Sequence, residues 1–464
     1  MVFSDLLFLL VFLPLFALLY ALGGLLDGKR FGGAPKTRNF VLVVFSLIFY
    51  AWGEPVYVFL MLGSVVLNYI AGRIIDSSEK GRKAALAAGV AVNLLILGTF
   101  KYAGFFAGCL RGLGLDVPDP GIALPIGISF YTFQSISYLV DVYRRESPAQ
   151  KNFMGLLLYI SMFPQLIAGP IVRYNTVSEG IRSRSVSRED VAEGMFRFTV
   201  GLGKKVILAN IIGETATQLL SGGGATVAGA WVGILAFTLQ IYFDFSGYSD
   251  MAIGIGRCIG FRFPENFRHP YCCNSITDFW RRWHISLGSF FRDYLYIPLG
   301  GNRRHQALNI LIVWLLTGMW HGASWNFILW GLYFGLIVML EKYTLLRWKK
   351  IPAPLLHLYS LLLVILGWGI FYFEDFGQMG VFFRNLFGGA PAWSDIEVTT
   401  ALTGNFWIWI AAIALCLPVR EWIEKRLSPG MLTGGRIVVS IVLLAASVML
   451  LVGATNNAFL YTRF

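Results

Sequence analysis

The sequence predicts an all-α membrane protein that crosses the bilayer several times, and three observations support this fold class. Of the 464 residues, 56% are hydrophobic and only 14% are charged, whereas soluble domains usually carry about 25% charged residues. Long windows contain no Asp, Glu, Lys or Arg, and basic residues gather between them. Too few polar residues remain to cover a soluble protein of this length, so lipid must be the solvent for much of the chain.

The uncharged windows define the expected helices. A bilayer core of about 30 Å is crossed by roughly 20 apolar residues, each rising about 1.5 Å along a helix. Windows of that length cover 6–26, 120–140, 152–172, 215–243, 305–340, 351–373, 398–419 and 437–462. With 39–53, 55–72 and 84–100 added, we expect about ten to twelve membrane-embedded helices, some of them buried or re-entrant.

The charges between these windows predict topology and partners. The first window lacks the basic start and the cleavage site of a signal peptide, so a retained helix is expected. Lys29, Arg30, Lys36 and Arg38 follow it, which by the positive-inside rule puts this loop in the cytoplasm and the N-terminus outside. The net charge of +12 lies in short interfacial clusters. Such clusters favour anionic lipid head groups or an anionic substrate over nucleic acid.

The domain organisation is expected to be a single membrane-embedded unit, residues 1–464, with one unusual insert. Residues 257–304 hold eight arginines, three acids, two histidines and many aromatic residues, and His305 follows directly. Within this basic and aromatic insert, TDFWRRWHISL (277–287) has the spacing of one short amphipathic helix. No repeat or low-complexity linker divides the chain.

Proline and glycine interrupt three of the apolar stretches. Gly53-Glu54-Pro55 divides 39–72, Pro125 falls early in 120–140, and Pro164 with Gly169-Pro170 lies within 152–172. Irregular backbone at membrane depth is tolerated where it is buried in protein or lines a cavity. The breaks therefore indicate an enclosed cavity, although kinks in ordinary membrane helices would give the same pattern.

His321 is the first candidate for chemistry, because it lies in 305–340, a segment expected to hold it within an apolar helix. An ionisable side chain inside a membrane segment is costly and marks a functional site by default. Imidazole can take a proton from a hydroxyl group and return it. Gly318 and Gly322 are expected to leave room beside the ring for a substrate. The alternative is a structural histidine at a helix end or bonded to a carbonyl or to Asn326.

His284 and two aspartates are weaker candidates. His284 stands beside two arginines, where a solvated histidine is ordinary. Asp244 and Asp250 could bind a cation, orient another side chain or cap a helix, but pairing with nearby arginines is favoured. Gly254 and Gly256 do not indicate a dinucleotide loop, because no strand precedes them.

Other reaction types lack their motifs. G-x-S-x-G, a Walker A loop and H-E-x-x-H are all absent. The five cysteines form no C-x-x-C pair, so neither a disulfide framework nor a metal centre is predicted. A membrane histidine without a partner nucleophile fits direct attack of a hydroxyl on a reactive ester, with the histidine as base.

Several long motifs resemble the membrane-bound O-acyltransferase (MBOAT) family, in its bacterial alginate O-acetylase-like branch. They include FYAWGEPVYVFLMLGSVVLNYI, LPIGISFYTFQSISYLVDVYR, FPQLIAGPIVRY, IYFDFSGYSDMAIGIGRCIGFRFPENFRHPY, SITDFWRRWHISLGSFFRDYLYIPLGGNR and GMWHGASWNFILWGLYFG. The resemblance runs from the first helix to about residue 340. It returns at the C-terminus, where FLYTRF looks like the ending of that branch.

The resemblance implies a fold and a set of site residues. The fold would be a ring of tilted helices around a central tunnel in which donor and acceptor meet. His321 matches the catalytic histidine of the family, and His284 matches a second histidine in FWRRWH. The residues expected to shape the tunnel or bind substrate are Trp280, Arg281, Trp283, Arg292, Trp320 and Asn326.

The resemblance also implies substrates, partners and location. The donor would be acetyl-coenzyme A or another acyl thioester, with no bound cofactor or metal. The acceptor would be an exported polysaccharide, peptidoglycan, or an extracytoplasmic SGNH-type acetyltransferase that relays the group. The location would be the bacterial inner (cytoplasmic) membrane. Relatives that transfer D-alanine to teichoic acid share several motifs, whereas YLYIPLGGNR favours the acetylase branch.

Two readings outside acyl transfer remain open at this point. A transporter or flippase would use His321 as a proton relay, and inverted repeats would favour it, although none is visible. A membrane scaffold for an exopolysaccharide machine would not need His321 at all.

Overall fold

The computed structural model describes residues 1–30, 33–344, 351–454 and 459–460. Within these ranges the regular secondary structure is entirely helical. The chain divides into two compact units, Met1–Phe198 with Tyr248–Pro264, and Thr199–Gly247 with Glu265–Phe464. Two of its boundaries fall inside long helices, α9 (Arg188–Gly203) and α11 (Val227–Cys258), and the third falls between Pro264 and Glu265, in the connection after α11. A single domain over 1–464 stays a prediction.

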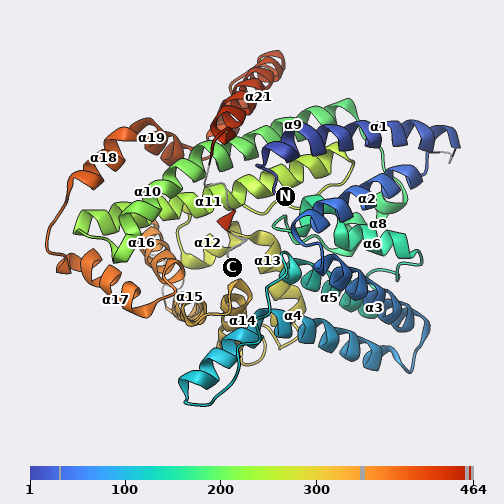
Figure 1. The fold of residues 1–464 in the computed structure, drawn as a ribbon, viewed down its shortest axis with the longest axis horizontal. Helices are drawn as coiled ribbons and strands as arrows, with labels where there is room; N and C mark the ends of the chain where they lie inside the picture. Colours follow the sequence, from blue (N-terminus) through green and yellow to red (C-terminus); the bar gives the residue numbers. More distant parts are fainter. Residues whose placement is uncertain (31–32, 345–350, 455–458, 461–464) are drawn as a thin grey trace. The chain divides into compact units, whose positions relative to one another are not determined.

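The first unit is built on pairs of neighbouring helices. Its elements are η1 (Phe8–Phe12), α1 (Leu13–Arg30), α2 (Lys36–Gly53), α3 (Tyr57–Ser77), α4 (Arg82–Gly112), α5 (Ile128–Arg144), α6 (Phe153–Ser161), α7 (Phe163–Leu166), α8 (Tyr174–Arg182) and the first part of α9. Helices α1 and α2 lie side by side, and α3, α4 and α5 pack on one another (Figure 1). Buried phenylalanine rings from η1, α2 and α7 fill the space between them.

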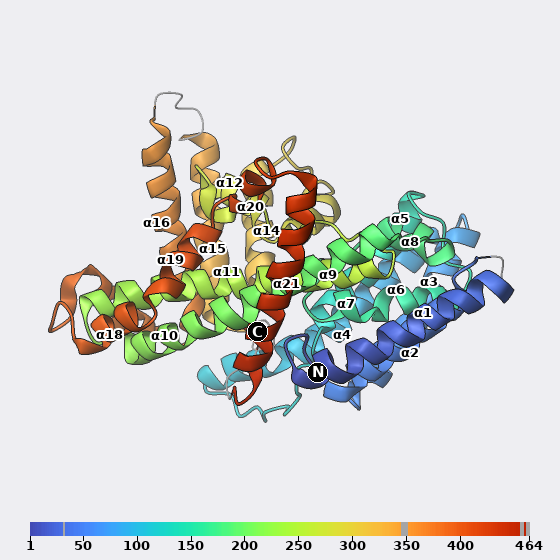
Figure 2. The same ribbon diagram turned by 90° about the horizontal axis from the view of Figure 1, so that it is seen from above.

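The second unit holds the basic and aromatic insert. After α9 come η2 (Lys204–Ala209), α10 (Asn210–Leu220), η3 (Ser221–Gly223), α11, η4 (Pro270–Cys272), α12 (Ile276–Arg282), α13 (Ile285–Phe291), η5 (Arg292–Tyr296), α14 (Gln306–His321), α15 (Trp325–Tyr343), α16 (Ala353–Tyr372), α17 (Phe376–Arg384), η7 (Asn385–Gly389), α18 (Ile396–Gly404), α19 (Phe406–Leu415), α20 (Val419–Glu424) and α21 (Pro429–Leu451). Helices α14 and α15 form a tightly packed hairpin, and α16 runs beside α15 (Figure 2).

Six of the described helices are long and apolar enough to cross a membrane. They cover Phe8–Gly28, Tyr57–Ser77, Arg82–Gly112, Val227–Cys258, Ala353–Tyr372 and Pro429–Leu451. The pair α18 and α19, bent by 66°, would make a seventh. The protein is therefore an all-α polytopic membrane protein. The expected ten to twelve embedded helices exceed this number because several uncharged windows fold as shorter or broken helices.

The broken windows follow the proline and glycine signals. The window 152–172 gives only the nine residues of α6 and the four of α7, with Pro164 in the first turn of α7. Helix α2 ends at Gly53 and α3 begins at Tyr57, as Gly53-Glu54-Pro55 predicted. The Glu54 carboxylate then accepts a hydrogen bond from the Ile126 N–H at 2.9 Å, which ties this break to the segment before α5.

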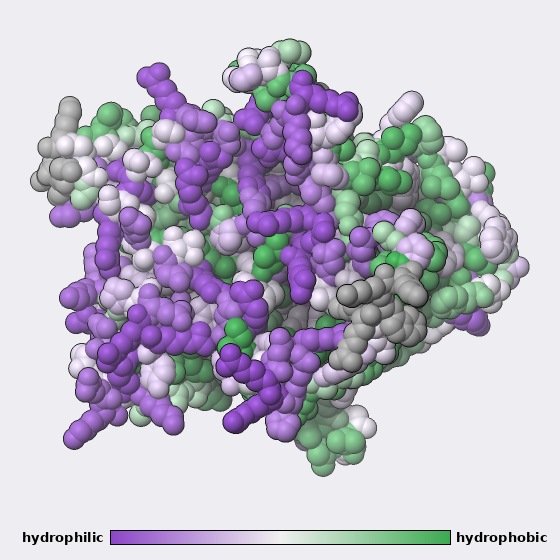
Figure 3. Space-filling model, turned by 180° about the vertical axis from the view of Figure 1, so that it is seen from behind, coloured by the Kyte–Doolittle hydropathy of each residue, from purple (hydrophilic) through white to green (hydrophobic). Residues whose placement is uncertain are grey.

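The surface is divided as a bilayer requires. Only 11% of the apolar windows of α4 and of α21 is buried, so most of their aliphatic side chains face outward, toward lipid. Hydrophilic side chains instead gather in broad areas of the face shown in Figure 3. Such areas suit head groups and water.

Candidate active site

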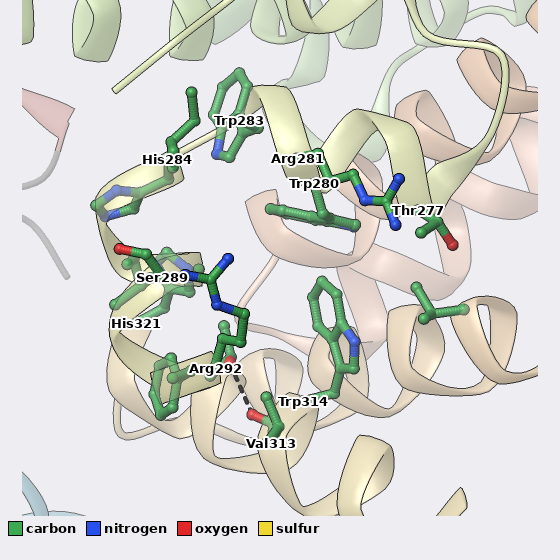
Figure 4. A pocket seen from close by; sticks show the side chains of 16 residues that line it. Thr277, Trp280, Arg281, Trp283, His284, Ser289, Arg292, Val313, Trp314 and His321 are labelled. Carbon is green, nitrogen blue, oxygen red and sulfur yellow. Dashed lines mark hydrogen bonds between the residues drawn. The ribbon is translucent and has the colours of Figure 1, made fainter. Parts of the chain in front are cut away.

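A cavity of about 430 Å³ lies within the second unit. Its walls come from α12, the corner between α12 and α13, α13, the first residue of η5, α14 and one residue of α15. Six of the eight predicted site residues line it, namely His284, His321, Trp280, Arg281, Trp283 and Arg292. In Figure 4 the two histidines lie on the left of the cavity and Trp280 and Trp314 on the right. Trp320 and Asn326 are not among its lining residues.

His321 is the last residue of α14 and is buried, with 6% of its surface exposed. The helix ends there because Gly322 is fully extended, and α15 begins at Trp325. The segment 305–340 thus folds as two helices, and His321 lies at a helix end and not in its interior. The rings of Trp330 and Phe371 stand edge-on to the imidazole at 5.0 and 5.4 Å. The carbonyl end of α14 favours a positive charge on this imidazole.

The two glycines near His321 do not leave room for a substrate, which corrects the sequence interpretation. A Cβ on Gly318 would collide with the carbonyl oxygen of Phe327, and one on Gly322 would enter the Phe327 ring. Gly331 on α15 faces Gly318 in the same way. These glycines allow α14 and α15 to approach closely, so they position His321 by packing.

His284 lies in a sharp corner between two short helices. The prediction of one amphipathic helix over 277–287 is wrong, because α12 ends at Arg282 and α13 begins at Ile285. His284 adopts a left-handed conformation with φ of 44°, which histidine accepts more readily than most residues. Its side chain is buried, with the ring of Phe245 edge-on at 4.7 Å.

Asn266 holds this corner, and sequence reasoning missed it. Its main-chain oxygen accepts the N–H of Ile285 at 3.0 Å. Its side-chain Oδ1 accepts the Ser286 N–H at 3.2 Å and the Ser286 hydroxyl at 2.9 Å. The Nδ1 of His284 lies 3.1 Å from the same oxygen. The only signal was the position of Asn266 in the motif PENF.

Burial also sets the charge of His284. Desolvation lowers the pKa of this imidazole from 6.5 to about 3. The N-terminal end of α13, which His284 precedes, likewise disfavours a positive charge. His284 is therefore neutral at physiological pH.

Trp320 and Asn326 have positions of a different kind. The Trp320 ring packs against both histidines, 5.7 Å from His284 and 5.1 Å from His321. Asn326 is fully buried at the start of α15, and its amide donates to the Phe371 carbonyl at 3.0 Å. Trp320 thus spaces the two histidines, and Asn326 joins α15 to the end of α16.

The aromatic wall of the cavity is rigidly supported. The Trp280 ring packs on Trp314 and Phe334, at 4.9 Å from each. Helix α12, which carries Trp280, is held at its N-terminus by the buried carboxylate of Glu341, which accepts the N–H groups of Ile276 and Thr277 at 2.6 and 2.8 Å. A carboxylate at this end of a helix also suits its dipole.

Two guanidinium groups border the cavity. Arg281 and Arg292 are both exposed, and both line it. Figure 4 shows the Arg292 side chain reaching between the histidines and Trp314. Arg292 also donates to the neighbouring carboxylate of Asp293 at 2.7 Å. Exposed guanidinium groups beside an aromatic cavity can bind phosphate oxygens in a bidentate way.

The two aspartates of IYFDFSGYSDMAIGIG are structural. Asp250 pairs with Arg197 at 2.8 Å, as predicted. Asp244 pairs with Lys205 at 2.6 Å, and both are buried. The predicted pairing of Asp244 with an arginine is thus wrong, because its partner is a lysine on η2. The second oxygen of Asp244 accepts the Leu460 N–H at 2.9 Å; residues 461–464 of the FLYTRF motif lie outside the described residues.

No metal centre is evident in the described part of the chain. There, no three His, Cys, Asp or Glu side chains come close enough to hold an ion. All five cysteines are free thiols.

Comparison with known proteins gives the family. The model of the membrane-bound O-acyltransferase family matches residues 142–376, about half of the chain. A probable alginate O-acetylase of Pseudomonas syringae is 41% identical over 417 residues, covering 87% of this chain and 78% of that protein. A peptidoglycan O-acetyltransferase of Helicobacter pylori is 35% identical, covering 74% of this chain and 70% of that protein.

A more distant relative matches about half of the chain. A teichoic acid D-alanyltransferase of Bacillus subtilis is 26% identical, covering 48% of this chain and 60% of that protein. The family match spans α12 to α15 and thus the whole cavity. The chain therefore belongs to the membrane-bound O-acyltransferase family, as an enzyme of its alginate O-acetylase-like branch.

Proposed function

We propose that this enzyme moves an acetyl group from a cytoplasmic thioester donor to a hydroxyl group on the outer side of the bacterial inner membrane, with His321 as the general base. The observation that carries the proposal is the meeting of two buried histidines and two exposed arginines on one cavity. The arginines suit the phosphates of acetyl-coenzyme A, and the aromatic wall suits its apolar arm.

The chemistry needs only proton transfer at His321. The acceptor hydroxyl attacks the thioester carbonyl carbon while the imidazole takes its proton. The carbon–sulfur bond then breaks, and the thiolate leaves with the proton from the imidazolium. The position of His321 at the carbonyl end of α14 supports this role, because the charged imidazolium is stabilised there. General base catalysis contributes typically about 10²–10⁴-fold to the rate.

The acceptor is proposed from the relatives. Proteins named for alginate and for peptidoglycan acetylation match most of this chain, which supports a cell-envelope polysaccharide or peptidoglycan as the final acceptor. An SGNH-type transferase that relays the acetyl group is the proposed partner. D-alanyl transfer is the second candidate, supported only by a match to about half of the chain.

The test replaces His321 and measures envelope acetylation. In cells carrying His321→Ala the rate of O-acetylation should fall at least about 10²-fold. Mass spectrometry of the envelope polymers measures it. The amount of protein in the membrane should stay unchanged. His305→Gln is the matched control, because His305 is exposed and outside the cavity. Near wild-type acetylation in His321→Ala would remove the assignment.

A further inference from the structure

The hydrogen bonds around His284 determine which of its ring nitrogens carries the proton. Oδ1 of an asparagine accepts hydrogen bonds and Nδ2 donates them, so the neighbours identify the atom that faces the corner. The Ser286 main-chain N–H lies 3.2 Å from the Asn266 atom that faces it. A main-chain N–H can only donate, so this atom must be the oxygen.

The same oxygen faces the imidazole. The distance from Asn266 Oδ1 to His284 Nδ1 is 3.1 Å. An amide oxygen can only accept, so Nδ1 must carry the hydrogen. The imidazole is neutral and has only one ring hydrogen, so Nε2 carries a lone pair.

The corner is built so that this arrangement persists. Asn266 is 1% exposed, and its main-chain oxygen is bonded to Ile285, the residue after His284. A second clamp joins the Arg268 N–H to the Arg282 carbonyl at 2.9 Å. The segment that carries Asn266 is thus fixed on both sides of the histidine, and a turn of the imidazole would break its bond to Oδ1.

We propose that Asn266 is a positioning residue that keeps His284, a residue of the cavity wall, in the Nδ1-protonated form, so that Nε2 is its accepting nitrogen. This inference rests on the proposed function for the identity of the substrate, but not for the tautomer. It gives the two histidines different tasks. With its hydrogen on Nδ1, His284 has no hydrogen on Nε2 to donate to a thioester carbonyl, whereas His321 is the proposed base.

A purely structural alternative exists, in which Asn266 only caps the first turn of α13. The two readings differ in what they predict for the ring nitrogens. If Asn266 only caps α13, replacing it lowers stability and leaves the tautomer of His284 unchanged. Positioning changes the protonation of His284 itself.

The first experiment observes the tautomer directly. The chain has only five histidines, so ¹⁵N-histidine spectra of the full protein in lipid nanodiscs are simple, and His284→Gln assigns the His284 signals. We expect a protonated Nδ1 and an unprotonated Nε2 between pH 5 and 8, in agreement with the lowered pKa. In Asn266→Leu the proton should move wholly or partly to Nε2. A protonated Nε2 in the wild type, or an unchanged tautomer in Asn266→Leu, would overturn the inference.

The second experiment links the tautomer to catalysis. Asn266→Leu should lower the transfer rate at saturating acetyl-coenzyme A by at least about tenfold, the range seen when a supporting hydrogen bond to a functional histidine is lost. The KM for the donor should change little. Ser286→Ala is the matched control, because it removes a hydroxyl from the same cluster but keeps the bond between Asn266 and His284. Equal losses in Ser286→Ala and Asn266→Leu would contradict positioning.

Asn266→Asp keeps the test decisive if the leucine variant does not fold. A carboxylate retains the accepting oxygen, but its charge makes His284 more basic. The titration of the His284 signals should therefore move to higher pH, because the new carboxylate would lie beside Nδ1. An unmoved titration would contradict the inference. A protein with the expected tautomer but no acetyl transfer would instead count against the proposed function.

Discussion

The imidazoles of His284 and His321 stand at opposite kinds of helix end, with the ring of Trp320 packed against both. His284 precedes the N-terminus of α13, and His321 closes the C-terminus of α14. The helix dipoles therefore disfavour a charge on the first imidazole and favour one on the second. Two residues of the same type thus have different electrostatic surroundings in one cavity.

The low pKa of His284 predicts how stability depends on pH. The pKa is about 3 in the folded protein and 6.5 as the reference value, so between these limits the unfolded chain binds the extra proton. Stability from this source is fully present above pH 6.5 and is lost as the pH falls toward 3. From pH 7 to pH 5 the loss is about 2 kcal/mol. Thermal melts in detergent should therefore fall less steeply with acid in His284→Gln than in the wild type; parallel curves would contradict this.

The arginines at the cavity predict how the donor binds. Arg281→Gln and Arg292→Gln should each raise the KM for acetyl-coenzyme A about tenfold or more, because a hydrogen bond to a charged group contributes about 1.5–3 kcal/mol. The effect should shrink at high salt. Arg303→Gln serves as control, since Arg303 is exposed but does not line the cavity. If all three variants behave alike, general surface charge and not these two side chains attracts the donor.

The close approach of α14 and α15 predicts the effect of a single methyl group. In Gly318→Ala the new Cβ meets the Phe327 carbonyl, and such overpacking costs about 1–3 kcal/mol. We expect a lower melting temperature and reduced transfer, because His321 is one turn away. Gly380→Ala is the control, since nothing lies within 4 Å of a Cβ there. Equal melting temperatures for the two variants would show that α14 and α15 can separate at little cost.

The sequence allowed the fold class to be predicted and His321 to be named as a candidate, because both depend on local composition. A charge-free window is visible without any contact being known, and so is a histidine inside it. Pro164 and Gly53-Glu54-Pro55 likewise break helices through their own backbone. The family motifs then strengthened His284 and supplied the residues around it, and the cavity brings five of these residues together with His321.

The rest depends on contacts between distant residues, which periodicity does not contain. The break at His284 is held by Asn266, eighteen positions earlier. The spacing of apolar residues does not contain this contact and therefore predicts one continuous helix. The glycines beside His321 were expected to leave space for a substrate. That space is filled by Phe327 of the next helix, α15, a contact that the local sequence does not reveal. Asn326 was expected to bind substrate because it follows His321 closely in the sequence. Its amide instead donates to the carbonyl of Phe371 on α16, a contact between distant residues.

The ion pair of Lys205 and Asp244 predicts a strong dependence of stability on each partner. Both side chains are buried at 2.6 Å, and Asp244 also accepts the Leu460 N–H. Lys205→Met leaves a buried carboxylate without its cation, and Asp244→Asn leaves a buried ammonium group without its anion. Each change should therefore cost about 3–5 kcal/mol.

The double variant Lys205→Met with Asp244→Asn distinguishes the cost of an unpaired buried charge from a simple loss of packing. Removing both charges leaves no unpaired ion, so its melting temperature should lie above that of either single variant. Additive losses would show instead that the two side chains act independently. His321 should remain functional in the double variant, because neither residue lines the cavity. Acetyl transfer measured below the melting temperature should then recover together with stability.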